Sequence, residues 1–242
     1  MYFSNKLSLL FIACPKTGST SIESYLMDLE PSGHKFKIIL DDREITSKDM
    51  HYGVIGHAHA WEYKKALGRE KYNQLHTFGI VRHPFDKLIS SYFYSKSKPI
   101  AYAFKNKGEK HLLKRKLKTL LSFIAPRILP ISIWALLFPM KTSYDYFHDK
   151  KGNRIVNYLG RTDYIDYDLD LILKEIGIET NLKIPHINKS KHKNQNHYFN
   201  NKWIRKYLSA KYAKDIYLYQ SVEQEINDLK PEMIKKESNI KL

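Results

Sequence analysis

An apolar run, a short loop rich in hydroxyl side chains and a helix-like stretch follow one another near the start of this chain. The run covers Leu7–Cys14, the loop reads Pro-Lys-Thr-Gly-Ser-Thr-Ser over residues 15–21, and the helix-like stretch covers about Thr20–Glu30. A buried strand that turns through such a loop into a helix aims backbone N–H groups and the positive end of the helix dipole at one point. The sequence therefore predicts a phosphate-binding loop. A secretory signal peptide is disfavoured because no small-residue cleavage site follows the run.

The loop differs from a Walker A loop, although it has similar ingredients. A Walker A loop needs Gly-x-x-x-x-Gly-Lys-Ser/Thr, whereas Lys16 here precedes Gly18 and no first glycine exists. Gly18 lets the backbone approach a ligand closely, and Lys16 adds a positive charge. Hydroxyl donors come from three further residues, Ser19, Thr20 and Ser21, and Thr17 lies between Lys16 and Gly18. The alternative is an ordinary helix start, because Thr20 and Glu23 have the spacing of a capping box.

A second strand-to-helix junction carries an arginine. The run Thr77–Arg82 has the pattern of a buried strand, and Pro84 is a favoured first-turn residue for a helix that reaches about Ser97. Arg82 ends the strand, and Ser90 lies two turns into the helix. An arginine can hold a phosphate through two parallel hydrogen bonds. We therefore expect Arg82 and Ser90 to clamp a second phosphate, away from the first loop.

Short apolar runs alternate with helix-like stretches along most of the chain. This alternation is typical of an α/β protein with a central parallel sheet and helices on both faces, which is a three-layer sandwich. We expect one domain over residues 1–242, with a helical insertion at about 101–140. The other expected strands are Lys35–Leu40 and Tyr52–Gly56, and the other expected helices are Ala60–Leu67, Asp166–Ile176 and one or two over Asn200–Leu229.

The chain carries 41 lysines and arginines against 25 aspartates and glutamates, a formal charge of +16. This surplus predicts an anionic partner: a nucleic acid, a membrane surface, or a phosphorylated or sulfated small molecule. No zinc finger, RNA-recognition signature or helix-turn-helix is evident, so we expect no nucleic-acid partner. Cys14 is the only cysteine, which excludes a disulfide within the chain and a cysteine-built metal site. The acidic stretch Asp166–Asp170 lacks the glycine and glutamate of an EF-hand loop, so we expect no metal.

The segment Thr119–Met140 is apolar and near the length of a spanning helix. Three prolines and Arg127 interrupt it, which disfavours a span through a bilayer. Two interpretations stay open. In the first, the segment packs its apolar face on the body of the protein. In the second, it contacts an anionic membrane surface, together with the basic stretch Lys110–Lys118 before it and Trp134 within it.

Together, the lysine loop and the Arg82/Ser90 pair resemble the two signatures of sulfotransferases that use 3′-phosphoadenosine 5′-phosphosulfate (PAPS). The resemblance implies a P-loop-NTPase-like sulfotransferase fold, with residues 16–21 on the 5′-phosphosulfate and Arg82 with Ser90 on the 3′-phosphate. The chain begins at its first strand, without the N-terminal membrane anchor of the Golgi members, which resembles the soluble bacterial members. Three further stretches resemble the carbohydrate branch that includes heparan sulfate 2-O-sulfotransferases: Gly56-His57, Ile155–Arg161 and His186–Ser190.

A histidine is expected to be the base that takes the proton of the acceptor hydroxyl. His57 follows an expected strand, at the edge where open α/β sheets bind ligands, and the resemblance implies the catalytic histidine at this position. His59 is the rival, two residues further on. Lys16 is the candidate for stabilising the leaving oxygen. In relatives, the equivalent of the basic loop 189–193 folds over the nucleotide, so Ser190 and Lys191 are binding candidates; a solvated charge run is the alternative.

The sequence thus predicts an enzyme that transfers a sulfuryl group from PAPS to a carbohydrate hydroxyl and releases adenosine 3′,5′-bisphosphate (PAP), without a metal. A P-loop-like nucleotide kinase or phosphotransferase is the first alternative. A basic protein that binds membranes or nucleic acids is the second. We expect a cytoplasmic protein, with association at the inner face of the membrane as the variant that the segment Thr119–Met140 suggests.

Overall fold

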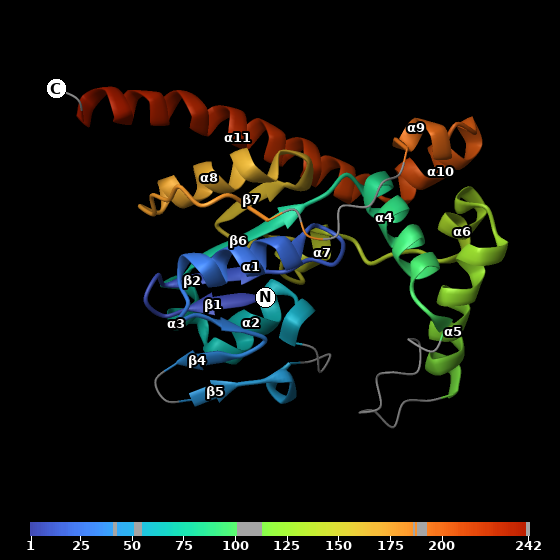
Figure 1. The fold of residues 1–242 in the computed structure, drawn as a ribbon, viewed down its shortest axis with the longest axis horizontal. Helices are drawn as coiled ribbons and strands as arrows, with labels where there is room; N and C mark the ends of the chain where they lie inside the picture. Colours follow the sequence, from blue (N-terminus) through green and yellow to red (C-terminus); the bar gives the residue numbers. More distant parts are fainter. Residues whose placement is uncertain (41–42, 51–54, 101–112, 186, 188–192, 241–242) are drawn as a thin grey trace. The chain divides into compact units, whose positions relative to one another are not determined.

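The structure is a computed structural model that describes residues 1–40, 43–50, 55–100, 113–185, 187 and 193–240 (Figure 1). The chain divides into two compact units. The sheet unit comprises Met1–Arg82, Thr142–Asn188 and Lys214–Leu242, and the helical unit comprises His83–Lys141 and Lys189–Ala213. The sheet unit has two apolar clusters and the helical unit has one.

A five-stranded sheet with the order β3-β1-β2-β6-β7 forms the centre of the sheet unit. Strands β2, β6 and β7 run parallel, as predicted, but β1 is antiparallel to both β2 and β3, so the sheet is mixed. The cause is the tight turn Asn5–Ser8, where the Ser8 N–H donates to the Asn5 carbonyl (3.0 Å), since so short a connection joins only antiparallel neighbours. The strands are β1 Tyr2–Ser4, β2 Leu9–Ile12, β3 His34–Lys35, β6 His76–Val81 and β7 Tyr158–Arg161.

The single strand predicted over Lys35–Leu40 is wrong, because the chain breaks there into two strands. Phe36 has a left-handed φ of 61°, which cannot continue a pleated strand. The chain therefore leaves the main sheet after Lys35. Beyond the break, β4 (Ile38–Leu40) pairs with β5 (Arg43–Ile45) in a separate two-stranded antiparallel sheet.

The strand predicted over Tyr52–Gly56 is wrong at its described end. Residues 52–54 lie outside the described residues, and Ile55–His57 forms a 3₁₀ helix, η2. Hydrogen bonds from neighbouring elements hold the carbonyls of this turn: the Tyr63 hydroxyl donates to Ile55, and the Met1 amino group donates to Gly56 (3.1 Å). Because these carbonyls accept from Tyr63 and Met1, they do not pair with a neighbouring strand.

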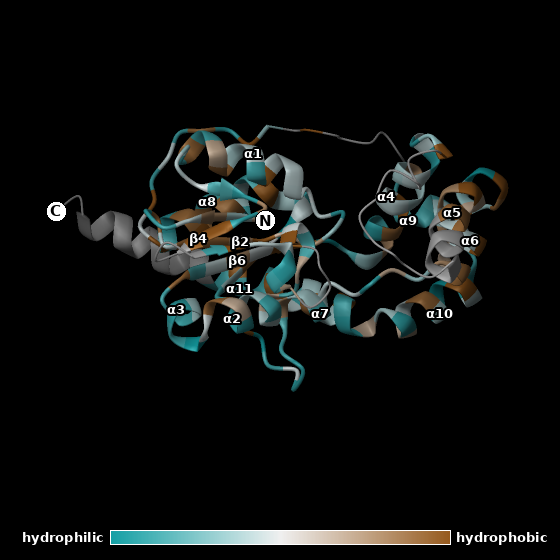
Figure 2. Ribbon diagram, turned by 90° about the horizontal axis from the view of Figure 1, so that it is seen from below, coloured by the Kyte–Doolittle hydropathy of each residue, from teal (hydrophilic) through white to brown (hydrophobic). Residues whose placement is uncertain are grey.

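Helices cover both faces of the central sheet, as predicted (Figures 1 and 2). Side chains of β2 alternate between two clusters, with Phe11 on one face and Ile12 on the other. The Phe11 face packs against α1 (Ser19–Leu29) and α8 (Ile165–Glu175). The opposite face packs against α2 (Ala60–Leu67), α3 (Arg69–Asn73), α7 (Tyr144–Phe147) and the first turns of α11 (Ala213–Ile240).

The predicted helix ends agree with the structure to within one or two residues at four helices. Gly68 and Gly177, which follow α2 and α8, both have left-handed φ, as expected of glycines at helix ends. The capping box predicted at Thr20 is wrong, because α1 begins one residue earlier with Gly18 as its N-cap. The Glu23 carboxylate instead accepts a hydrogen bond from the Met1 amino group (2.6 Å).

The helical unit contains α4 (Pro84–Ser97), α5 (Leu113–Ile128), α6 (Ile131–Leu137), α9 (Gln195–Tyr198) and α10 (Lys202–Lys211). The segment Thr119–Met140 supplies Ala125, Ile131, Trp134 and Ala135 to its core, beside residues such as Phe85 and Leu208. One face of that apolar segment is therefore packed within this unit. Within the described residues, no helix combines the length and the apolar character that a membrane span needs.

Replacing Gly79 by alanine should destabilise the sheet unit. Gly79 lies in β6, and a Cβ atom there would clash with the ring of Phe147. Phe147 is fully buried and has little room to move, and overpacking of this kind costs about 1–3 kcal/mol. Urea unfolding of the wild type and Gly79→Ala measures the loss of unfolding free energy.

Phe147→Leu provides the matched background for this test. Leucine lacks the ring atoms that clash, so Gly79→Ala should cost less in the Phe147→Leu background than in the wild type. Equal costs in both backgrounds would show that the clash with Phe147 is not the cause.

Candidate anion-binding and catalytic site

The parallel strands β2, β6 and β7 are neighbours, so their carboxyl ends meet at one edge of the sheet. Three segments leave the sheet there: the loop Ala13–Gly18 after β2, Arg82 after β6, and η4 (Thr162–Tyr164) after β7. Ligands of open α/β sheets bind at this edge. The topology thus brings the predicted loop and the predicted arginine together, although 66 residues separate Lys16 from Arg82.

The loop Ala13–Gly18 has an unusual backbone conformation. Lys16 and Gly18 both have left-handed φ, 67° and 82°, and such a conformation in a non-glycine residue persists only where its surroundings impose it. Thr17 is fully buried, and its hydroxyl donates to the Cys14 carbonyl (2.9 Å), which closes the turn. Because Gly18 is the N-cap, it presents no side chain to the first N–H groups of α1, which have no partners within a helix. The loop therefore offers an anion mainly its backbone.

Neighbouring side chains hold two carbonyls of the loop. Arg82 Nη1 donates to the Lys16 carbonyl (3.3 Å), and Thr162 Oγ1 lies 3.3 Å from the Thr17 carbonyl and 3.0 Å from the Val81 carbonyl. In a trans peptide the N–H points opposite to the C=O. Holding the carbonyls of Lys16 and Thr17 therefore turns the N–H groups of the next residues, Thr17 and Gly18, to the other side of the loop.

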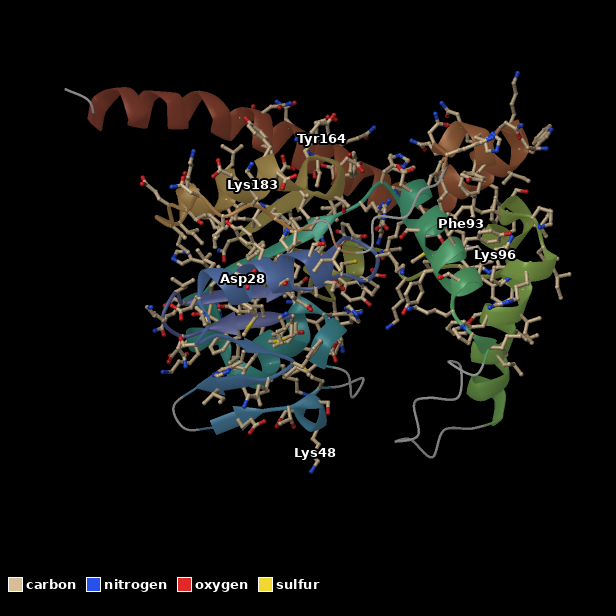
Figure 3. The ribbon with its side chains drawn as sticks, in the orientation of Figure 1. Asp28, Lys48, Phe93, Lys96, Tyr164 and Lys183 are labelled. Carbon is tan, nitrogen blue, oxygen red and sulfur yellow. The ribbon has the colours of Figure 1, made fainter. Side chains whose placement is uncertain are left out.

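Arg161, the last residue of β7, is a structural cation rather than a ligand-binding one. It is buried, and its guanidinium makes two hydrogen bonds to the fully buried Asp168 (2.9 and 3.0 Å) and one to Glu223 (3.2 Å). The Asp168 carboxylate raises the pKa of Arg161 further above its usual value. The guanidinium also lies over the ring of Tyr164, 4.4 Å from its centroid. Tyr164 is labelled in Figure 3. These contacts keep η4, and with it Thr162, in place.

His57 lies at the end of η2, next to the strand that enters the loop. Its Nδ1 is 3.0 Å from the Ala13 carbonyl. A carbonyl only accepts, so Nδ1 carries the proton and Nε2 of the neutral ring keeps its lone pair, as a base requires. Desolvation lowers the pKa of His57 below 6.5, against the opposing effect of the Ala13 carbonyl. The ring is neutral at pH 7 and remains partly open to solvent.

His59, the rival candidate, is buried and serves the fold. It is the N-cap of α2, and its backbone N–H donates to Glu62 (2.8 Å). Its Nδ1 accepts from the Trp61 indole (3.3 Å), and its ring packs against Tyr146 at 4.4 Å. Ring and backbone are thus engaged inside the sheet unit, which favours His57 as the group that meets a substrate.

The remaining predicted residues are distributed differently. Ser19 and Thr20 lie in the first turn of α1, with Thr20 exposed. Ser21 is buried, and its hydroxyl accepts from the Ile187 N–H (3.1 Å) and lies 3.4 Å from the Ile187 carbonyl, so it ties the segment before the basic loop to α1. Ser90 lies half-buried in α4 of the helical unit. Ser190 and Lys191 lie outside the described residues.

No group of three or more potential metal ligands is gathered among the residues that the structure describes. Of the three aspartates that suggested an EF-hand loop, Asp168 is held by Arg161 within α8. The Arg161 guanidinium thus balances the charge of one of these three carboxylates.

Sequence reasoning missed Thr162 as a part of the site. The residue directly follows Arg161, so it was next to a stretch already noted, Ile155–Arg161. Only the four residues Tyr158–Arg161 form β7, and the glycine among them weakens the strand pattern. Had β7 been predicted as a strand, a hydroxyl residue at its carboxyl end would have been a candidate at the same edge as Lys16 and Arg82.

Comparison with models of protein families matches residues 1–222 with the model described as the sulfotransferase family. The match includes all the segments of the site and ends within α11. Comparisons with curated proteins and with solved structures found no match.

Thr162→Val should weaken the binding of PAP by about threefold to tenfold, the size of one or two lost hydrogen bonds. Valine keeps the shape of threonine but leaves the carbonyls of Thr17 and Val81 without this donor. The loop then no longer has its N–H groups held in one direction. Isothermal titration of PAP into wild type, Thr162→Val and Thr162→Ser measures the effect, and serine should restore most of the affinity.

Thr142→Val is the matched control for this series. The Thr142 hydroxyl accepts from the Asp145 N–H (3.2 Å) at the start of α7 and does not bond the carbonyls of Thr17 and Val81. Its loss should lower the unfolding free energy while PAP affinity stays unchanged. A Thr162→Val variant that binds PAP as tightly as the wild type would contradict the positioning role.

Proposed function

We propose that the chain, which belongs to the sulfotransferase family, transfers a sulfuryl group from PAPS to a hydroxyl of a carbohydrate acceptor. Family membership establishes a sulfotransferase, and the family generally uses PAPS. The proposal for donor, acceptor and base rests on one observation above all: the lysine loop, Arg82 and His57 meet at the carboxyl edge of β2 and β6.

The residues at this edge fit the two phosphates of the donor. The N–H groups of Thr17 and Gly18 and the first turn of α1 are suited to the 5′-phosphosulfate, with Lys16 adding a positive charge. Arg82 is suited to the 3′-phosphate, because a planar guanidinium fork matches the geometry of a phosphate and Arg82 follows β6 at the edge where the lysine loop lies. In this proposal Ser90 is its partner, Ser19, Thr20 and Ser21 line the loop side, and Ser190 and Lys191 belong to a segment that covers the nucleotide.

PAPS, when bound, supplies the sulfuryl group. In the proposed step, His57 Nε2 takes the proton from the acceptor hydroxyl while the acceptor oxygen bonds to sulfur. The bond between sulfur and the 5′-phosphate oxygen breaks, and Lys16 with the loop N–H groups stabilises the charge that develops on that oxygen. The products are the sulfated acceptor and PAP. The Ala13 carbonyl stabilises the imidazolium that forms, because it accepts from Nδ1 in both protonation states.

A carbohydrate is the acceptor class that the sequence resemblance supports. Of the stretches that carry the resemblance, Gly56-His57 lies in η2 and Ile155–Arg161 runs into β7, so both end at the site. Ile187, in the third stretch, is bonded to Ser21 of α1.

PAP should raise the thermal unfolding midpoint of the wild type, and AMP and Mg-ATP should not. A ligand at 100 times its dissociation constant adds about 2.7 kcal/mol to stability, which for a chain of this size is a shift of roughly 5–10 °C. Arg82→Ala should abolish the shift, and Arg82→Lys should restore only part of it, because lysine lacks the planar fork. A shift with Mg-ATP and none with PAP would sink the proposal and favour a phosphotransferase.

His57→Ala should lower kcat by about 10²- to 10⁴-fold, the usual contribution of a positioned base. It should leave the thermal shift by PAP unchanged, since the alanine removes no phosphate ligand. His76→Ala, at an exposed position at the start of β6, is the matched control and should keep full activity. Activity is measured as PAP release with a panel of carbohydrate acceptors.

The pH profile gives a second readout for His57. Desolvation lowers the pKa of its imidazole, so the basic form predominates at neutral pH and is lost as the pH falls through a pKa below 6.5. The acidic limb of kcat/KM should therefore lie below pH 6.5 in the wild type and disappear in His57→Ala. A limb that persists in the variant would assign the base to another group.

A further inference from the structure

The net positive charge of the chain comes from the helical unit. This unit contains 19 lysines and arginines and two acidic residues, a formal charge of +17. The sheet unit contains 22 basic and 23 acidic residues, a formal charge of −1. The lysine loop, Arg82 and His57 all lie in the nearly neutral sheet unit. The surplus of charge therefore lies outside these three parts of the site, and it fits an anionic partner of its own.

The helical unit also exposes aliphatic side chains on α5 and α6. Ile128 is 74% exposed and Leu137 is 61% exposed, and Leu121 and Ile133 are exposed as well. In α6 the buried residues Ile131, Trp134 and Ala135 pack in the core, while Ile133 and Leu137, four residues apart, form an apolar face in solvent. No charged residue occurs between Ile128 and Met140, so no charge interrupts the apolar face of α6. Figure 2 shows the hydrophobic colouring of both helices.

A third exposed apolar element is α10. Trp203 is 80% exposed and Tyr207 is 52% exposed, and their spacing of four residues puts them on one face of the helix. Lys206, which is also exposed, lies beside them on this face. Amphipathic rings beside cations are typical of the interface between a bilayer and water.

We propose that the helical unit docks on the surface of an anionic lipid bilayer. Its lysines and arginines attract the negative headgroups, and the exposed side chains of Ile128, Leu137 and Trp203 enter the boundary between headgroups and acyl chains. A polysaccharide or nucleic acid would satisfy the charge but offers no apolar phase for exposed isoleucine and leucine. The observation that separates the partners is thus the aliphatic face of α5 and α6. The inference does not depend on the proposed sulfotransferase donor or acceptor.

Sedimentation of the full chain with vesicles tests the proposal. Vesicles of phosphatidylglycerol and phosphatidylcholine should bind the protein, whereas vesicles of phosphatidylcholine alone should not. Binding should weaken when salt rises from about 0.1 M to about 1 M, because screening shortens the range of the attraction. The fluorescence of Trp203 should shift to the blue on binding, and Trp203→Phe should remove this part of the signal.

Two double variants separate lipid insertion from charge attraction. Ile128→Ser/Leu137→Ser keeps every charge and should weaken vesicle binding by about tenfold or more, because two aliphatic side chains no longer leave water. Leu182→Ser/Tyr217→Ser, at exposed positions of the sheet unit, is the matched control and should bind as the wild type does. The thermal unfolding midpoint verifies that each variant is folded.

Two outcomes would overturn the docking proposal. One is equal vesicle binding by the wild type and Ile128→Ser/Leu137→Ser, which would reduce the interaction to charge. The other is failure to bind anionic vesicles while soluble dextran sulfate binds, which would identify the partner as a polyanion. Absence of a thermal shift by PAP would contradict the proposed donor but would leave the vesicle result standing.

Discussion

The hydrogen bonds from Thr162 to the carbonyls of Thr17 and Val81 join the carboxyl ends of three parallel strands. Without this link, the turn after β7 would be separate from the loop after β2 and from Arg82, which are themselves joined by the hydrogen bond of Arg82 to the Lys16 carbonyl. With it, the direction of the loop carbonyls is set by β7, which Arg161 and Asp168 anchor in the interior. The geometry of the loop thus depends on a buried ion pair that acts on it through Thr162.

Much of this arrangement could be predicted from the sequence. The loop between β2 and α1, the arginine directly after β6 and the ends of α2, α4 and α8 follow from glycine and proline positions and from apolar periodicity, although Ser19–Ser21 of the predicted loop lie in α1. The match of a sulfotransferase family model to residues 1–222 confirms the family that the two motifs suggested. These features are local, since each depends on the sequence of about ten neighbouring residues.

The features that could not be predicted depend on contacts between distant residues. β1 pairs with β2 because of a four-residue turn, and its three residues are too few to show a period. The break at Phe36 follows from a left-handed backbone that aromatic residues rarely adopt. The 3₁₀ helix at Ile55–His57 is held by Tyr63 and Met1, one of them more than fifty residues away. Thr162 became visible only once β7 was placed beside β6.

The bond between His57 and the Ala13 carbonyl has a mechanical consequence. Ala13 is the first residue of the loop, so the imidazole is hydrogen-bonded to the same stretch of backbone that presents the N–H groups of Thr17 and Gly18. The proposed base and the proposed anion-binding backbone are thus joined by one hydrogen bond, so a shift of the loop would carry the imidazole with it. The fold, rather than the incoming molecules, sets the spacing between them.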